Sequence, residues 1–105
     1  MIIENKKNLI IEKIKNEDNE TLLIFTSYKT TIAIYNITSK KMLLNNKKIN
    51  VSRKGMIEAY KSSSTTLKQL KHFINNYVEY NFYTSLDAFE KKIQNNNNII
   101  LNQYI

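Results

Sequence analysis

The segment Thr31-Ile32-Ala33-Ile34-Tyr35-Asn36-Ile37-Thr38 decides the fold, because β-branched and aromatic residues fill most of it. In a strand its residues would alternate between two faces, and both faces are largely apolar. A strand with two apolar faces is typical of a central position in a sheet. The segment therefore predicts a central strand in a sheet that is covered on one face.

Two segments before this strand predict a hairpin. Residues 8–15 and 21–27 are rich in branched side chains, and Asn16-Glu17-Asp18-Asn19 between them is a cluster of turn formers. Residues 8–15 also fit a helical stripe through Ile10 and Ile14, but we favour strand–turn–strand.

After the central strand, a polar turn at 38–41 leads into Met42-Leu43-Leu44, and residues 49–52 alternate again. These segments predict an antiparallel meander of about four strands.

The hydrophobic period then changes to that of a helix. One helix is expected over 65–78, with Thr66 and Gln69 as a capping box. It would lie across one face of the sheet and bury a single stripe, formed by Leu67, Leu70, Phe73, Ile74, Tyr77 and Val78.

A second, shorter helix is expected over 85–94, with Thr84 or Ser85 as its N-cap. Four consecutive asparagines end it, because their side chains compete for backbone hydrogen bonds. The tail at 99–101 forms a short strand or packs on the core. The sequence thus predicts one α+β domain over residues 1–105.

Composition excludes several classes of protein. The chain has no cysteine, one histidine and one glycine. A disulfide scaffold, a thiolate zinc site, a cysteine nucleophile and a glycine-rich phosphate loop are therefore excluded, and we expect no cofactor or metal. The longest apolar runs are four residues, and Met1-Ile2-Ile3-Glu4 lacks the features of a leader. We expect a soluble, cytoplasmic protein that does not bind membranes.

Positive charge is concentrated in the middle of the chain. Residues 21–76 hold nine lysines, Arg53 and a single acid, Glu58, whereas residues 1–20 and 77–105 each carry a net charge of −1. Such a block attracts polyanions. The alternative is a solvated lysine-rich surface that only keeps the protein soluble.

One segment has the features of an anion site. Gly55 permits a sharp turn after Arg53-Lys54, and a run of five hydroxyl residues leads into a helix whose first amides are unpaired. Tyr60 can stack on a base. The candidate binding residues are Arg53, Lys54, Tyr60, Lys61, Ser62, Ser64, Thr65, Lys68 and Lys71.

The same residues have a purely structural interpretation. Serine and threonine before a helix are ordinary N-caps, and Tyr60 can fill the core. His72 lacks nearby partners suited to catalysis, and no spacing of the nine acids resembles a carboxylate metal loop. An enzyme is therefore the weakest class.

Two stretches resemble a family of short domains of unknown function from phages and mobile elements. Residues 27–35 (SYKTTIAIY) are similar to a strand pair of the form S-Y-x-T-x-I-A-x-Y, and residues 60–73 (YKSSSTTLKQLKHF) are similar to its helix entry. The resemblance covers about residues 20–75, and residues 53–59 are additional to its pattern. It implies no activity, only a context: a phage-type accessory protein that blunts a host defence.

The first hypothesis is therefore a basic, non-enzymatic anti-defence inhibitor, of anti-CRISPR or anti-restriction type. It would act in the host cytoplasm by binding a host nuclease, its nucleoprotein complex, or nucleic acid directly. The alternative is an interaction or self-assembly module that forms a homodimer through aromatic residues near the C-terminus. These residues are Tyr77, Tyr80, Phe82 and Tyr83.

Overall fold

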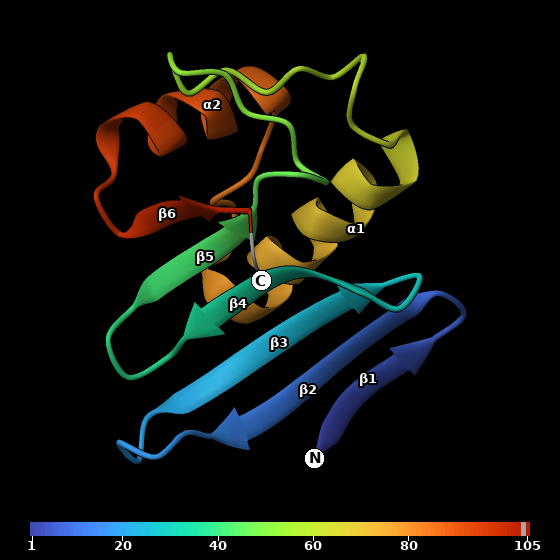
Figure 1. Ribbon diagram of the computed structural model, residues 1–105, viewed down its shortest axis with the longest axis vertical. Helices are drawn as coiled ribbons and strands as arrows, with labels where there is room; N and C mark the ends of the chain where they lie inside the picture. Colours follow the sequence, from blue (N-terminus) through green and yellow to red (C-terminus); the bar gives the residue numbers. More distant parts are fainter. Residues whose placement is uncertain (104) are drawn as a thin grey trace.

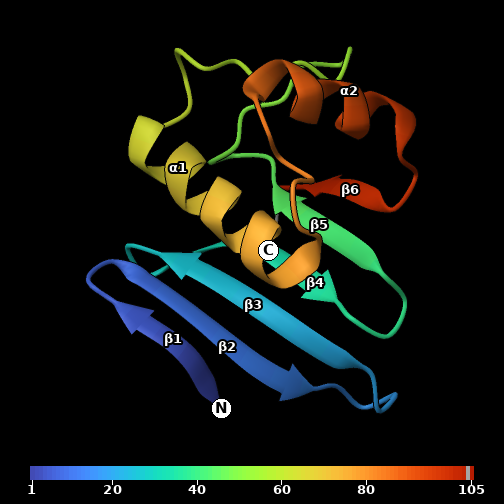
Figure 2. The same cartoon turned by 180° about the vertical axis from the view of Figure 1, so that it is seen from behind.

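The computed structural model describes residues 1–103 and 105. Within these residues the strands form one six-stranded sheet in the order β1-β2-β3-β4-β5-β6. Helix α1 crosses one face of the sheet, and α2 lies alongside the β6 edge (Figures 1 and 2). The expected α+β class is confirmed.

The first five strands form the antiparallel meander. They are β1 (Ile2–Lys6), β2 (Leu9–Lys15), β3 (Thr21–Ser27), β4 (Thr30–Asn36) and β5 (Lys41–Asn45). The expected hairpin is β2–β3, and the predicted central strand is β4. Short turns join them, as an antiparallel meander requires.

Alternation along these strands places a large apolar set on one face. Cross-strand neighbours Ile11, Phe25 and Ala33 are fully buried, as is Leu44 beside Ala33 on β5. Phe25 stacks on Phe73 of α1 with 5.4 Å between ring centroids. The core therefore lies between this face and the helices.

The expectation of about four strands is wrong, because the described residues form six. Strand β1 is added at one edge through the tight Lys7-Asn8 turn, where Asn8 adopts a φ of 65°. Strand β6 (Ile99–Asn102) is added at the other edge, parallel to β5. The short strand that the tail at 99–101 offered is confirmed, but its parallel pairing needs a long crossover and is not indicated by short-range patterns. The sheet is therefore mixed.

The segment 49–52 is not a strand. Only Val51 takes part in an isolated bridge, to Ile57, within the loop that connects β5 to α1. Ile49 and Ile57 are nonetheless buried in the core. The alternation in this segment reflects side chains that anchor a loop.

The long helix predicted over 65–78 is also wrong. Helix α1 (Ser64–Phe73) has ten residues, and a π-helical segment, η1 (Ile74–Val78), follows it. The capping box is wrong too, because Ser63 is the N-cap and accepts a hydrogen bond from the amide of Thr66. The Gln69 side chain instead hydrogen-bonds to Ser27 of β3 and to Asn8 in the β1–β2 turn. The π segment changes the direction of Tyr77 relative to a continuous α-helix.

The second helix, α2 (Leu86–Asn95), matches the expected segment, and Ser85 caps it. Phe89 and Ile93 face the core, where Phe89 stacks on Tyr83 at 4.5 Å. None of the helices in the described part of the chain is long and apolar enough to cross a membrane.

Candidate functional site

Two turns and the middle of α1 meet at one end of the sheet. The amide of Tyr28, in the β3–β4 turn, donates to the carbonyl of Asn8 in the β1–β2 turn, at 3.2 Å. The side chain of Gln69 joins both turns, because it accepts from the Ser27 hydroxyl and donates to the Asn8 carbonyl. Both turns lie at the same end of the strands (Figures 1 and 2).

Three lysines lie on the segments that meet at this junction. Lys7 lies in the first turn, Lys29 in the second, and Lys68 precedes Gln69 on α1; all three are exposed. Tyr28, next to Lys29 in the second turn, has 57% of its surface exposed. We call Lys7, Tyr28, Lys29 and Lys68 the basic rim. Proteins that bind single-stranded nucleic acid combine exposed aromatic rings, on which bases stack, with cations that contact phosphates.

The β3–β4 turn is strained. Tyr28 and Lys29 have φ values of 48° and 67°, in the left-handed region. Asn-Gly is the usual pair for a two-residue hairpin turn of this kind, because left-handed backbone is unfavourable for larger side chains. The chain thus places a tyrosine and a lysine where the fold alone favours smaller residues, and strain of this kind clusters at functional sites.

An acidic network lies next to the rim. Glu4 on β1 accepts hydrogen bonds from Tyr77 at 2.6 Å and from His72 at 2.9 Å, and it pairs with Lys6 at 3.2 Å. Burial raises the pKa of Glu4, but the bonds from Tyr77, His72 and Lys6 outweigh it and lower the pKa from 4.5 to about 2. The bond to Glu4, with burial, raises the pKa of Tyr77 to about 12. The network fastens β1 to the helix that carries Lys68.

Of the residues expected to bind an anion, Lys68 belongs to the basic rim, and Lys71 lies on the next turn of α1. Ser64 and Thr65 are exposed in its first turn, whereas Ser62 is buried and its hydroxyl accepts from the amide of Asn50. Ser62 therefore holds the loop in place.

Tyr60 and Lys61 form a separate exposed pair. Tyr60 is 82% exposed, and the Lys61 ammonium lies 5.5 Å from its ring centroid. Lys61 also pairs with Glu58 at 3.2 Å, and that hydrogen bond raises its pKa. The local charge of Lys61 is thereby balanced by a carboxylate.

Arg53 and Lys54 are not brought together with the lysines of α1. They line a hollow with Gln94 and Asn95, near the end of α2. Gly55 has a φ of 77°, and a Cβ built on it would lie 2.5 Å from Cγ of Gln94. Its conformational freedom therefore serves close packing of the loop on α2.

The aromatic residues near the C-terminus are mostly engaged within the chain. Tyr83 is 5% exposed and stacks on Phe89, Phe82 is half-buried, and Tyr77 bonds to Glu4. Tyr80 is 82% exposed. This segment thus offers one exposed ring at its surface.

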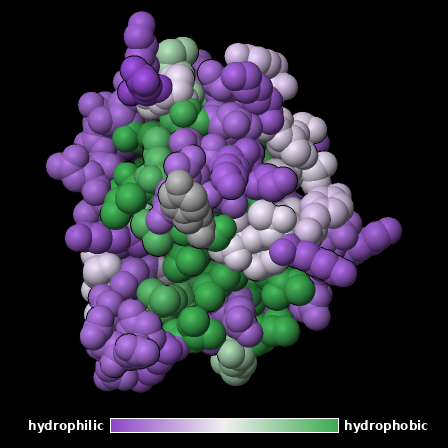
Figure 3. Space-filling model, in the orientation of Figure 1, coloured by the Kyte–Doolittle hydropathy of each residue, from purple (hydrophilic) through white to green (hydrophobic). Residues whose placement is uncertain are grey.

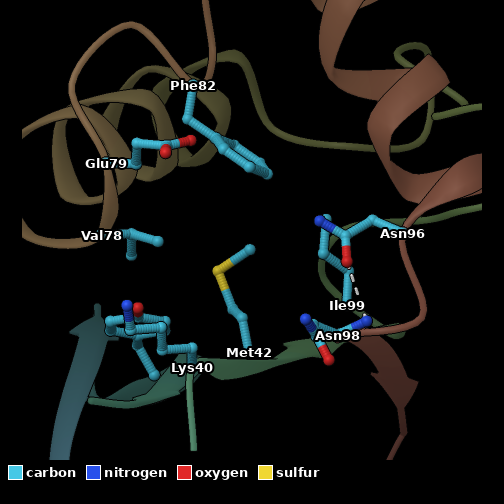
Figure 4. Close-up of a pocket in the computed structure, with 9 residues that line it drawn as sticks. Lys40, Met42, Val78, Glu79, Phe82, Asn96, Asn98 and Ile99 are labelled. Carbon is cyan, nitrogen blue, oxygen red and sulfur yellow. Dashed lines mark hydrogen bonds between the residues drawn. The ribbon is translucent and has the colours of Figure 1, made fainter.

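A second hollow, of about 290 Å³, lies between β5, η1 and the start of β6 (Figure 4). Its apolar lining includes Met42, Val78 and Phe82, and Lys40 and Glu79 contribute charges of opposite sign. Burial, and then Glu79, raise the pKa of the adjacent Tyr35. The hollow can hold a small group with both apolar and polar parts.

Within residues 1–103 and 105, no three His, Asp or Glu side chains are grouped to hold a metal ion. Comparison with known proteins gives no match: no family model fits the chain, and no curated protein or solved structure is significantly similar to it. A function must therefore be argued from the geometry.

Sequence reasoning did not identify Lys7, Tyr28 and Lys29 as site residues. Each turn is only two residues long and lacks glycine. The available signal is topological: in a meander, alternate turns lie at the same end of the sheet. Using it requires β1, which the sequence did not predict.

Proposed function

We propose that this protein is a non-enzymatic binder of single-stranded nucleic acid, free or held in a nucleoprotein. The observation that carries the proposal is the basic rim, where hydrogen bonds bring together the two turns and the helix segment that carry Lys7, Lys29, Lys68 and the exposed Tyr28. Stacking on the tyrosine and contacts from lysines to phosphates do not depend on the nucleotide sequence, so we expect binding without sequence preference.

The rigidity of the rim supports this assignment. Gln69 ties α1 to both turns, and the Glu4 network fixes β1 against the same helix. Binding groups on a fixed framework lose little conformational entropy when a ligand binds. Tyr60 and Lys61, which precede α1 in the chain, form a separate exposed ring and cation where a base can also stack.

A binder of this kind suits the accessory role that the resemblance of residues 20–75 implies. By covering guide RNA or DNA held by a host immune nuclease, it would block the nuclease without catalysing a reaction. The net charge of +7 supports a partner that carries negative charge, as nucleic acid does.

The test is a pair of triple charge reversals. Lys7→Glu, Lys29→Glu and Lys68→Glu alter the basic rim, whereas Lys15→Glu, Lys40→Glu and Lys91→Glu alter exposed lysines elsewhere. Each triple changes three +1 charges to −1, so the net charge falls by six, from +7 to +1. Only the location of the change differs between the two variants.

Affinity for a labelled single strand of about 20 nucleotides is measured over a range of salt concentrations. The rim triple should lose at least about 100-fold in affinity, and the slope of log K against log salt should fall by about 2. The control triple should lose much less. Equal losses in the two variants, or an unchanged rim variant, would refute the proposal.

A further inference from the structure

The face of the sheet opposite the helices carries many apolar side chains, and no helix of the described residues packs on it. Alternation points six apolar side chains of β2 to β5 away from the core, and all of them are half-buried or exposed. We call this surface the open face; its apolar residues are Ile10, Ile14, Leu22, Ile24, Ile34 and Leu43. None of them belongs to the core cluster.

Every strand of the sheet contributes at least one apolar side chain to this face. Register aligns Glu12, Ile24, Ile34 and Leu43 in one row, which continues to Ile100 on β6. Ile2 on β1 pairs with Glu12 at the other end; Ile2 and Ile100 are 51% and 40% exposed. Figure 3 shows the hydrophobic residues gathered over these strands. Contiguous apolar patches of this extent mark interaction sites.

The charges at this face are few and lie on either side of its centre. Glu12 lies on β2 and Lys41 on β5, one strand outward from the β3–β4 pair on each side. Glu20 lies at the margin, where Asn16 and Asn36 hydrogen-bond to it and where Lys41 contributes to lowering its pKa. Neither Glu12 nor Lys41 forms a salt bridge within the described residues.

We propose that the open face packs against the same face of a second copy of the chain. The twofold axis runs parallel to the strands, between β3 and β4, so that β2 of each copy faces β5 of the other. In an isologous interface every contact occurs twice, so Glu12 approaches Lys41 of the second copy and Lys41 approaches its Glu12.

The charges favour this axis over the other face-to-face arrangement. An axis perpendicular to the strands would place β2 over β2 and bring Glu12 near the Glu12 of the second copy, which is unfavourable. With the parallel axis, Glu12 of one copy and Lys41 of the other lie two residues apart along the strand direction, which is about 7 Å. A lysine side chain spans this distance. Sheets packed in this way form an aligned sandwich.

The available area sets the expected strength. Six strands about 4.8 Å apart span about 24 Å, and their mean length is about 20 Å, so the face measures roughly 500 Å² per copy. The total, about 1,000 Å², is at the lower limit for a specific interface. The dimer should therefore form reversibly, with a dissociation constant in the micromolar range.

The first measurement is sedimentation of the full chain over about 1 to 500 μM. The mass should rise from 12.4 kDa toward twice that value as concentration increases. Ile34→Lys should weaken association at least about tenfold, because it buries a charge at the centre of the face. Asn97→Lys, an exposed position outside the face, is the control. A monomer at every concentration would overturn the proposal.

A charge exchange tests the arrangement without altering the apolar face. Glu12→Lys alone and Lys41→Glu alone should each weaken association by about threefold or more, because each places like charges together. The double variant should recover the wild-type constant. Failure to recover it, with circular dichroism showing folded protein, would refute this twofold arrangement.

A lipid surface is the alternative occupant of the open face, and flotation with zwitterionic lipid vesicles tests it. We expect the protein to stay out of the vesicle fraction. Flotation that Ile34→Lys abolishes would show that the face serves a lipid surface, and would overturn the proposal. The variant with Lys7→Glu, Lys29→Glu and Lys68→Glu should still dimerise. Failure of nucleic-acid binding can therefore be distinguished from failure of dimerisation.

Discussion

The hydroxyl of Tyr77, in the π-helical segment after α1, donates a 2.6 Å hydrogen bond to the carboxylate of Glu4 on the edge strand β1. The two residues are 73 positions apart, so the bond joins the first strand of the sheet to the end of the α1–η1 helical segment. His72 adds a second donor to the same carboxylate, whose side chain is 11% exposed. This contact holds an otherwise exposed edge strand in place.

Glu4→Gln should lower the free energy of unfolding at pH 7 by about 2 kcal/mol, because the folded state stabilises the charged carboxylate. The pKa of Glu4 is lowered to about 2 in the folded chain, so its contribution is present above pH 4.5 and is lost as pH falls toward 2. Urea unfolding at several pH values measures this.

Two variants control for this prediction. Tyr77→Phe removes the hydroxyl donor and should also destabilise the protein at pH 7, and Glu17→Gln in the exposed β2–β3 turn should not. A difference between wild type and Glu4→Gln that stays constant down to pH 2 would contradict the assigned ionisation.

Replacing Tyr28-Lys29 with Asn-Gly should stabilise the fold and weaken nucleic-acid binding. Relief of left-handed backbone strain is worth about 1 kcal/mol, or roughly 5 °C in Tm. Loss of the stacking ring and one lysine should reduce affinity at least about tenfold. Thermal melting and the strand-binding assay measure the two effects. A variant that gains stability and retains full affinity would show that Tyr28 and Lys29 take no part in binding.

Gly55→Ala should destabilise the protein by about 1 to 2 kcal/mol. The φ of 77° disfavours an L side chain, and the new Cβ would collide with Cγ of Gln94. The double variant Gly55→Ala with Gln94→Ala removes the colliding atom and should recover part of the loss. If Gln94→Ala gives no recovery, the collision has no part in the effect.

Local pattern identified those elements whose contacts lie nearby in the sequence. Strand β4, the β2–β3 hairpin, and α2 with its Ser85 cap follow from alternation, helical periodicity and turn residues. Periodicity also located the apolar stripe of α1 but did not indicate its end. The backbone becomes π-helical from Ile74, but Tyr77 and Val78 still fit the sequence spacing of an α-helical stripe. The sequence pattern therefore does not show where α1 ends.

Prediction of the candidate site was partial for a related reason. The sequence identified Lys68 through its place at the start of a helix, but Lys7 and Lys29 join it only because two turns pack on Gln69. Arg53 and Lys54, although close to Lys61 in the sequence, lie against the end of α2. Proximity in sequence is therefore a poor guide to charge clusters in a chain with a long loop.

The amino-acid sequence by itself determined an α+β protein with a basic middle segment, because hydrophobic period and net charge are local and additive properties. Only the tertiary structure decided the positions of β1 and β6, the packing of the two turns that carry Lys7, Tyr28 and Lys29 on Gln69, and the apolar face of the sheet opposite the helices. Each of these depends on pairing between distant segments, such as the parallel register of Met42 with Ile99. Such pairing is selected by the packing energy of the whole chain and leaves no signal in any short stretch of residues.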